Sequence, residues 1–113
     1  MCKHNILAEN SSGYILFCGG CGNYQLAFGT SIVNFEPADY RKFGNHIAEL
    51  KGTTSLSGSG KAKQICVNIY CRNAMMILNH YELAELGSLL DEAQFSEEIE
   101  FVLEECHIKQ SDH

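Results

Sequence analysis

Apolar and polar residues alternate along the first third of the chain, and this pattern predicts β-strands. Short apolar or alternating runs occur at Tyr14–Phe17, Asn23–Phe28 and Ser31–Phe35. Gly29-Thr30 separates the last two runs, and a two-residue loop that contains glycine is typical of a tight hairpin. We therefore expect a leading strand followed by a β-hairpin.

Beyond residue 36 the apolar spacing changes to three and four residues, which marks one face of a helix. Four large residues form this face: Tyr40, Phe43, Ile47 and Leu50. Pro37 suits the first helical position, and Gly52 is expected to end the helix. The small, polar segment TTSLSGSGKAK follows, so we expect a mobile loop near residues 52–63.

The second half of the chain repeats this order. Gln64–Tyr70 alternates and Ala74–Leu78 is apolar, which predicts a second pair of strands. Asn79 is placed to cap a helix, and Glu82 is placed to complete a capping box. The stripe of this helix consists of Leu83, Leu86 and Leu90. A further helix is expected from Ser96, with one face formed by Ile99, Val102, Leu103 and Cys106.

These elements predict an α+β fold built from two β-β-α units, with a leading strand before them and a C-terminal helix after them. We expect an antiparallel sheet of about five strands and three helices, mainly on one face, in a single domain over residues 1–113. Gly44 and Gly87 occupy corresponding places in the two repeated helices. Glycine inside a helix costs about 1 kcal/mol relative to alanine, so its use in both helices suggests close packing there.

Composition and charge narrow the function classes. Hydrophobic residues make up 45% of the chain and proline occurs once, which suits a globular domain. The sequence has no apolar run long enough to cross a bilayer and no signal peptide, so we expect a cytoplasmic protein with reduced thiols. The net charge is −6, which argues against nucleic acid as a partner.

The charges are unevenly distributed. Residues 51–81 hold Lys51, Lys61, Lys63 and Arg72 and no acid, whereas nine acids lie between Glu82 and Glu105. One interpretation is an acidic, solvated helix face beside a mildly basic loop. The other is a complementary contact between the two regions, within one chain or between two.

Cys18 and Cys21 form a C-x-x-C surrounded by glycine. In thioredoxin-type enzymes such a pair begins a helix, whose N-terminus helps to activate the thiol. Here an alternating run follows the pair, so we expect it in a turn between two strands, as in a zinc knuckle. Gly22 fits this interpretation, because the position after the second cysteine often needs a positive φ.

A knuckle supplies half of a tetrahedral site, and Cys2 and His4 can supply the other half. On an extended segment the C-x-H spacing puts both side chains on one face. Cys2, His4, Cys18 and Cys21 would form a Cys₃His set, which is a known structural zinc combination. Two other interpretations of the C-x-x-C remain open: a redox pair or labile disulfide, and a structural accident without chemistry.

The remaining cysteines and histidines are weaker candidates. Cys66 and Cys71 are five residues apart and would lie on opposite faces of a regular strand, whereas Cys106 fits an apolar core stripe. No pattern pairs His46 or His80 with a nucleophile. The sequence therefore contains no recognisable catalytic constellation.

Three sequence motifs are similar to those of a known family: C-x-H-x-I-L near the start, then G-Y-x-x-x-C-x-x-C, then Y-Q-L-x-F-G. Together they resemble an uncharacterised family of small bacterial proteins, defined only as a domain of unknown function. The resemblance covers most of the chain. It implies a bacterial, cytoplasmic protein and supplies no activity, substrate or catalytic residue.

We therefore expect a non-catalytic, zinc-stabilised binding or assembly module. The alternative is a small thiol-disulfide enzyme that uses Cys18 and Cys21. We also expect a homodimer, because the Gln64–Tyr70 edge carries little charge and no proline, so it is open to pairing. A face that bears Val33, Phe35, Met76 and Leu78 would also sit poorly in water. An unknown protein partner remains open, and neither nucleic acid nor a membrane is expected.

Overall fold

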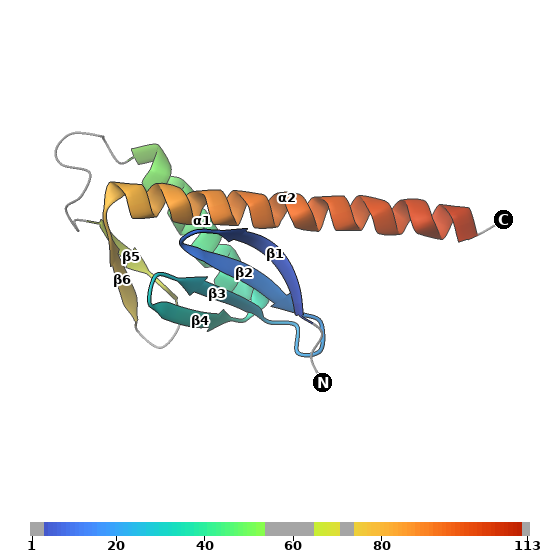
Figure 1. The fold of residues 1–113 in the computed structure, drawn as a ribbon, viewed down its shortest axis with the longest axis horizontal. Coiled ribbons are helices and arrows are strands. Elements are labelled where there is room, and N and C mark those ends of the chain that lie inside the picture. The colour runs from blue at the N-terminus through green and yellow to red at the C-terminus, as the bar shows by residue number, and fades with distance from the viewer. Residues whose placement is uncertain (1–3, 54–64, 71–73, 112–113) are drawn as a thin grey trace.

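The computed structural model describes residues 4–53, 65–70 and 74–111 (Figure 1). An antiparallel sheet in the order β1-β2-β3-β4 comes first, formed by β1 (His4–Asn10), β2 (Gly13–Cys18), β3 (Tyr24–Phe28) and β4 (Ser31–Phe35). Helix α1 (Pro37–Thr53) leads to a separate two-stranded sheet of β5 (Ile65–Asn68) and β6 (Met75–Leu78). Helix α2 (His80–Ser111) follows and runs well past the sheet toward the C-terminus (Figure 1).

Local sequence signals explain where several elements begin and turn. Gly29 adopts a φ of +59° in the hairpin that joins β3 to β4, and α1 begins at Pro37 as expected. The capping box of α2 is confirmed: the Glu82 N–H donates to Asn79 Oδ1 at 2.8 Å, and the Asn79 N–H donates to Glu82 Oε1 at 2.9 Å. These hydrogen bonds satisfy backbone groups that the first helical turn leaves open.

The β1–β2 hairpin was not predicted as a pair of strands. Asn10 closes its turn, because its Oδ1 accepts from the Ser12 N–H at 2.8 Å and from the Gly13 N–H at 3.1 Å. Gly13 is required here, since a Cβ at this position would collide with the carbonyl group of Ala27 on β3. A register shift between Ile6 and Ala8 interrupts the β1–β2 ladder and the regular alternation of β1.

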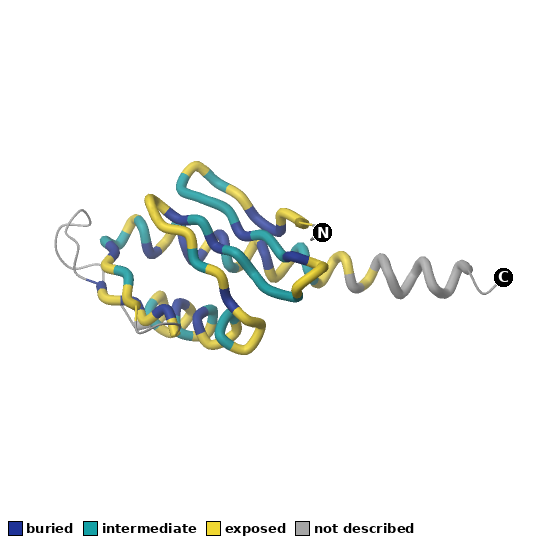
Figure 2. The backbone as a smooth tube through the Cα atoms, turned by 90° about the horizontal axis from the view of Figure 1, so that it is seen from below, coloured by how far each residue is buried: buried dark blue, intermediate teal, exposed yellow. Residues whose placement is uncertain are grey.

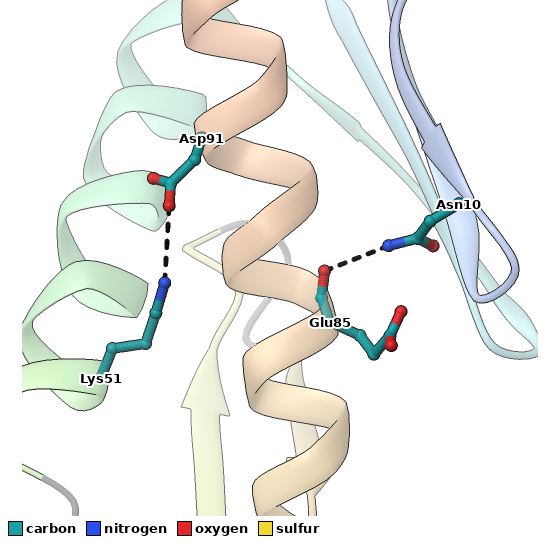
Figure 3. A network of polar contacts seen from close by, with 4 residues as sticks. All are labelled: Asn10, Lys51, Glu85 and Asp91. Atoms are coloured by element: carbon teal, nitrogen blue, oxygen red, sulfur yellow. Dashed lines mark hydrogen bonds and ion pairs between the residues drawn. The ribbon is translucent and has the colours of Figure 1, made fainter.

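The core lies between the four-stranded sheet, the β5–β6 hairpin and the two helices (Figure 2). Ile15 and Leu26 face each other across β2 and β3 and are fully buried against Phe43, Leu86 and other helical side chains. Asn10 also ties β1 to α2 through its side-chain amide, which donates to the Glu85 carbonyl at 3.4 Å (Figure 3). None of the described helices is long and apolar enough to cross a membrane.

The architecture is α+β as predicted, but the count and grouping of elements differ. Over the described residues there are two sheets, of four and two strands, and two helices instead of three. The helix expected from Ser96 is a continuation of α2, because no glycine or proline lies between Ser88 and Ser111 to end the helix. The two β-β-α units do exist, as β3-β4-α1 and β5-β6-α2, although their strands belong to different sheets.

The apolar face that argued for a dimer is part of the core. Phe35 and Leu78 are buried, and Val33 and Met76 pack against the core cluster, so that prediction of exposure is wrong. The reason is that the two sheets turn these faces toward the helices instead of presenting one open surface. The predicted loop also begins later, because α1 continues to Thr53, and the rest of the loop lies outside the described residues.

The close helix packing predicted at the two glycines is not found at Gly44. A Cβ at Gly44 would have no neighbour within 4 Å, whereas one at Gly87 would meet the flexible stem of Lys51. Lys51 extends across this part of α2 to Asp91, with Nζ 3.5 Å from Oδ2 (Figure 3). This pair joins the basic and acidic halves of the chain, but both side chains are exposed, so it adds little stability.

Candidate metal centre

The C-x-x-C lies in a tight turn between β2 and β3, as the sequence predicted. Cys18 is the last residue of β2, and the Gly22 N–H donates to its carbonyl at 2.8 Å. The Cys18 N–H donates in turn to the Asn23 carbonyl at 2.9 Å. Gly22 has a φ of +77°, a conformation that L-residues with a side chain rarely adopt. The backbone therefore folds back on itself around the first cysteine.

The Cys21 N–H donates to Cys18 Sγ at 3.4 Å. In zinc and rubredoxin knuckles, backbone N–H groups point at the cysteine sulfur in the same way, which stabilises the thiolate. Cys18 is buried and Cys21 is exposed, and neither forms a disulfide. One sulfur of the pair is thus held inside the turn while the other is open to solvent.

His4 lies beside this turn. It is the first described residue of β1, and the register pairs it directly with Cys18. Residues paired in this way in an antiparallel sheet point to the same face, with Cβ atoms about 5 Å apart. Side chains alternate along a strand, so His4 and Cys18 share the face opposite to the one on which Ile15 is buried. The exposed imidazole is therefore a neighbour of the buried thiol.

The predicted ligand set is brought together only in part. Cys2 lies outside the described residues, and within the described ones no group of three or more His, Cys, Asp or Glu side chains is arranged to hold a metal ion. His4, Cys18 and Cys21 thus lie on adjoining elements without converging on one point. Cys71 and the side chain of Cys106 also lie outside the described residues.

The other thiol and imidazole groups belong elsewhere in the fold. Cys66 is exposed on β5, in the smaller sheet. His46 on α1 accepts a hydrogen bond at Nε2 from the Asn68 N–H, at 3.2 Å, which gives it a structural role. His80 begins α2 and has no nucleophile beside it among the contacts of the described residues.

A second feature, a groove of about 550 Å³ between α1 and α2, was missed by sequence analysis. Its floor is Tyr24 stacked on Tyr40, with ring centroids 3.9 Å apart and planes 2° from parallel. The Tyr24 hydroxyl donates to Glu97 Oε2 at 2.7 Å. Arg41, Asp91 and Gln94 line the walls. Both tyrosines looked like ordinary apolar positions in the sequence, and no local pattern links Tyr24 to Glu97.

Burial controls the chemistry of both tyrosines. Burial, together with the hydrogen bond to Glu97 and its negative charge, raises the pKa of Tyr24 to about 12. Burial also raises the pKa of Tyr40, as does the nearby charge of Glu97. Phenols with raised pKa values stay protonated at neutral pH and are poor general bases. The groove therefore holds protonated, stacked rings that join β3, α1 and α2.

Comparison with known proteins gives a family and no function. A family model of unknown function matches residues 1–111. The chain belongs to DUF6686. The expected resemblance to an uncharacterised family is therefore confirmed, although the match does not test which residues define DUF6686. No curated protein and no solved structure is similar to this DUF6686 chain at a significant level.

Proposed function

We propose that the protein is a non-catalytic binding or assembly module whose N-terminal strand is fixed by a structural zinc ion. The ligands would be Cys2, His4, Cys18 and Cys21. The observation that carries the proposal is the turn at Cys18, where the Cys21 N–H donates to Cys18 Sγ at 3.4 Å. His4 pairs with that same cysteine across the sheet. Cys2 is only two residues from His4, within about 7 Å along the chain, which is close enough to reach the same ion.

Zinc would act on the fold in a definite way. Binding requires His4 and Cys21 to turn their side chains toward Cys18 Sγ. The ion would then tie the start of β1 to the turn between β2 and β3. Structural zinc sites of this class contribute on the order of 10 kcal/mol at neutral pH. With all four positions filled by protein, the ion keeps no open position for substrate or water, so it stabilises and does not catalyse.

The alternative is a thiol-disulfide enzyme that uses Cys18 and Cys21. The local structure favours it less, because the residues after Cys21 lead into β3 and no helix begins at the pair. The site thus lacks the helix N-terminus that activates the thiol in thioredoxin-type enzymes. Cys21 is nevertheless exposed, so the alternative is tested alongside the zinc site. For both proposals we place the protein in a bacterial cytoplasm, where thiols stay reduced.

Serine variants test the site. Cys18→Ser and Cys21→Ser each remove one thiolate, so zinc content should fall from about one ion per chain to near zero. Cys66→Ser is the matched control, because it removes an exposed thiol from the other sheet. It should keep the full zinc content. Elemental analysis of protein purified without chelator gives the readout.

The same variants separate the two proposals. Full zinc content in both Cys18→Ser and Cys21→Ser would reject the ligand assignment. An equal loss of zinc in Cys66→Ser would mean that zinc binds loosely to any surface thiol. That result would also reject the ligand assignment. A metal-free wild type in which Cys21 reacts rapidly with an alkylating reagent would favour the thiol enzyme.

A further inference from the structure

Within the described part of the chain, the β5–β6 hairpin has one edge that is covered and one that is open. The Asn68 N–H donates outward to His46 on α1, so Asn68 and its partner Met75 form a pair without hydrogen bonds between them. Hydrogen-bonded and non-hydrogen-bonded pairs alternate along an antiparallel ladder. Cys66 and Ile77, two residues further along, are therefore also a pair without hydrogen bonds between them. The backbone N–H and C=O groups of Met75 and Ile77 therefore point away from β5, along the outer edge of β6.

These outward groups have no hydrogen-bond partner among the residues that the structure describes. The two large side chains beside them are also open to water, with Met75 64% and Ile77 54% exposed. Natural sheets protect such edges with charge, proline or a covering element, yet Ala74–Asn79 contains neither a charged residue nor proline. A sheet of two strands is also only marginally stable by itself, so added strands would stabilise it.

The edges of the larger sheet differ from one another. The β1 edge is covered by α2, because Ser96 Oγ donates to the Leu7 carbonyl at 2.7 Å and the Glu9 N–H donates to Glu92 Oε2 at 3.0 Å. Strand β4 forms the other edge and exposes Ile32 to the same extent as Met75, at 64%. Strand β4 thus supplies a matched control for any claim about β6.

We propose that a second copy of this chain pairs with the outer edge of β6. An antiparallel pairing centred on Met76 sets Met75 opposite Ile77 of the second copy, and the reverse. Each pair then exchanges both of its backbone hydrogen bonds, because these residues carry the outward groups. The two hairpins become one continuous four-stranded sheet. The proposal names the partner of the assembly role proposed above, but it does not require zinc.

A second copy fits this edge better than the other exposed apolar surface, on α2. That surface consists of Phe95, Ile99 and Val102, and Glu98 lies within it. Two copies joined there would bring the Glu98 carboxylates of both chains close together, in a protein whose net charge is already −6. The β6 edge has no charge to repel its own copy, and a two-fold contact must be complementary to itself. Met75 and Ile77 meet that condition, because a two-fold axis at Met76 sets each of them opposite the other in the second copy.

Sedimentation equilibrium at micromolar concentration tests the proposal. The wild type should have twice the monomer mass of 12.6 kDa. Met75→Lys places a charge on the β6 edge and should return the mass to that of the monomer, whereas Ile32→Lys on the β4 edge should remain dimeric. Both positions are exposed, so both variants should fold, which circular dichroism verifies. In hydrogen exchange, the amides of Met75 and Ile77 should gain protection as concentration rises.

Each result decides the matter. The β6 assignment would be overturned by a monomeric wild type or by a Met75→Lys protein that stays dimeric. It would also be overturned if only Ile32→Lys dissociated the dimer, and that result would assign the contact to β4. Zinc content measured on the same samples keeps the two proposals apart. A zinc-free dimer would contradict the metal site only, and a zinc-loaded monomer would contradict the β6 contact only.

Discussion

At the residue scale, Tyr24 combines two ring contacts with a hydrogen bond that favours the protonated phenol. It stacks on Tyr40, tilts against Phe17 with ring centroids 5.0 Å apart, and donates a hydrogen bond to Glu97. Burial and, after it, the hydrogen bond to the Glu97 carboxylate raise its pKa to about 12. A tyrosinate at this position would lose the hydrogen bond and face a negative charge.

This arrangement predicts that the protein loses stability at alkaline pH. The unfolded phenol releases its proton near pH 10.0, whereas the folded one keeps its proton until about pH 12. The folded state therefore binds more protons in this window, and its free energy of unfolding falls as pH rises through it. Tyr24→Phe removes this contribution, so its stability should decline less steeply between these pH values. Denaturant unfolding at a series of pH values checks this, and identical slopes in both proteins would refute it.

Sequence analysis located residues whose role depends on near neighbours. The positive φ of Gly22, the hairpin at Gly29 and the capping box of Asn79 with Glu82 all follow from local chemistry. Tyr24 and Glu97 are 73 residues apart, and they meet only because the fold brings α2 beside the first residue of β3. The pairing of His4 with Cys18 was anticipated as a shared metal site, although the strand that creates it was not.

At the element scale, Gly44 weakens α1 without any packing benefit. Its Cβ position is empty to 4 Å, so alanine fits, and Gly44→Ala should stabilise the protein by about 1 kcal/mol through helix propensity. Gly13→Ala is the contrasting variant, because its Cβ would collide with the Ala27 carbonyl, and it should destabilise the protein. Denaturant midpoints measure both changes. A loss of stability in Gly44→Ala would mean that the helices pack more closely there than they do in the structure.

The order of elements from β2 to the start of α2 was predictable, because each of these elements carries its own periodicity and its own end signals. The grouping of strands into two sheets was not, since pairing depends on contacts between distant parts of the chain. Strand β1 was missed as a strand because the register shift between Ile6 and Ala8 breaks its alternation. The third helix was predicted wrongly because the apolar stripe from Ser96 onward was interpreted as a new helix. In the structure α2 continues through these residues and extends past the sheet.

At the scale of the whole molecule, we propose different tasks for the two ends of the body. The β1–β2 edge and the β2–β3 turn hold the proposed zinc ligands, and the β5–β6 hairpin presents an open edge for assembly. In the groove between α1 and α2, Tyr24 of β3 stacks on Tyr40 of α1. The central claim is the metal site, because it explains the geometry at Cys18 and decides between a structural module and a thiol enzyme.

That claim is tested most directly by the zinc content of wild-type protein purified without chelator, measured together with the alkylation rate of its thiols. The account predicts about one zinc ion per chain. It also predicts that Cys18 and Cys21 resist alkylation until a chelator removes the metal, while the exposed Cys66 reacts at once. Protein without zinc, in which Cys21 reacts as fast as Cys66, would contradict it.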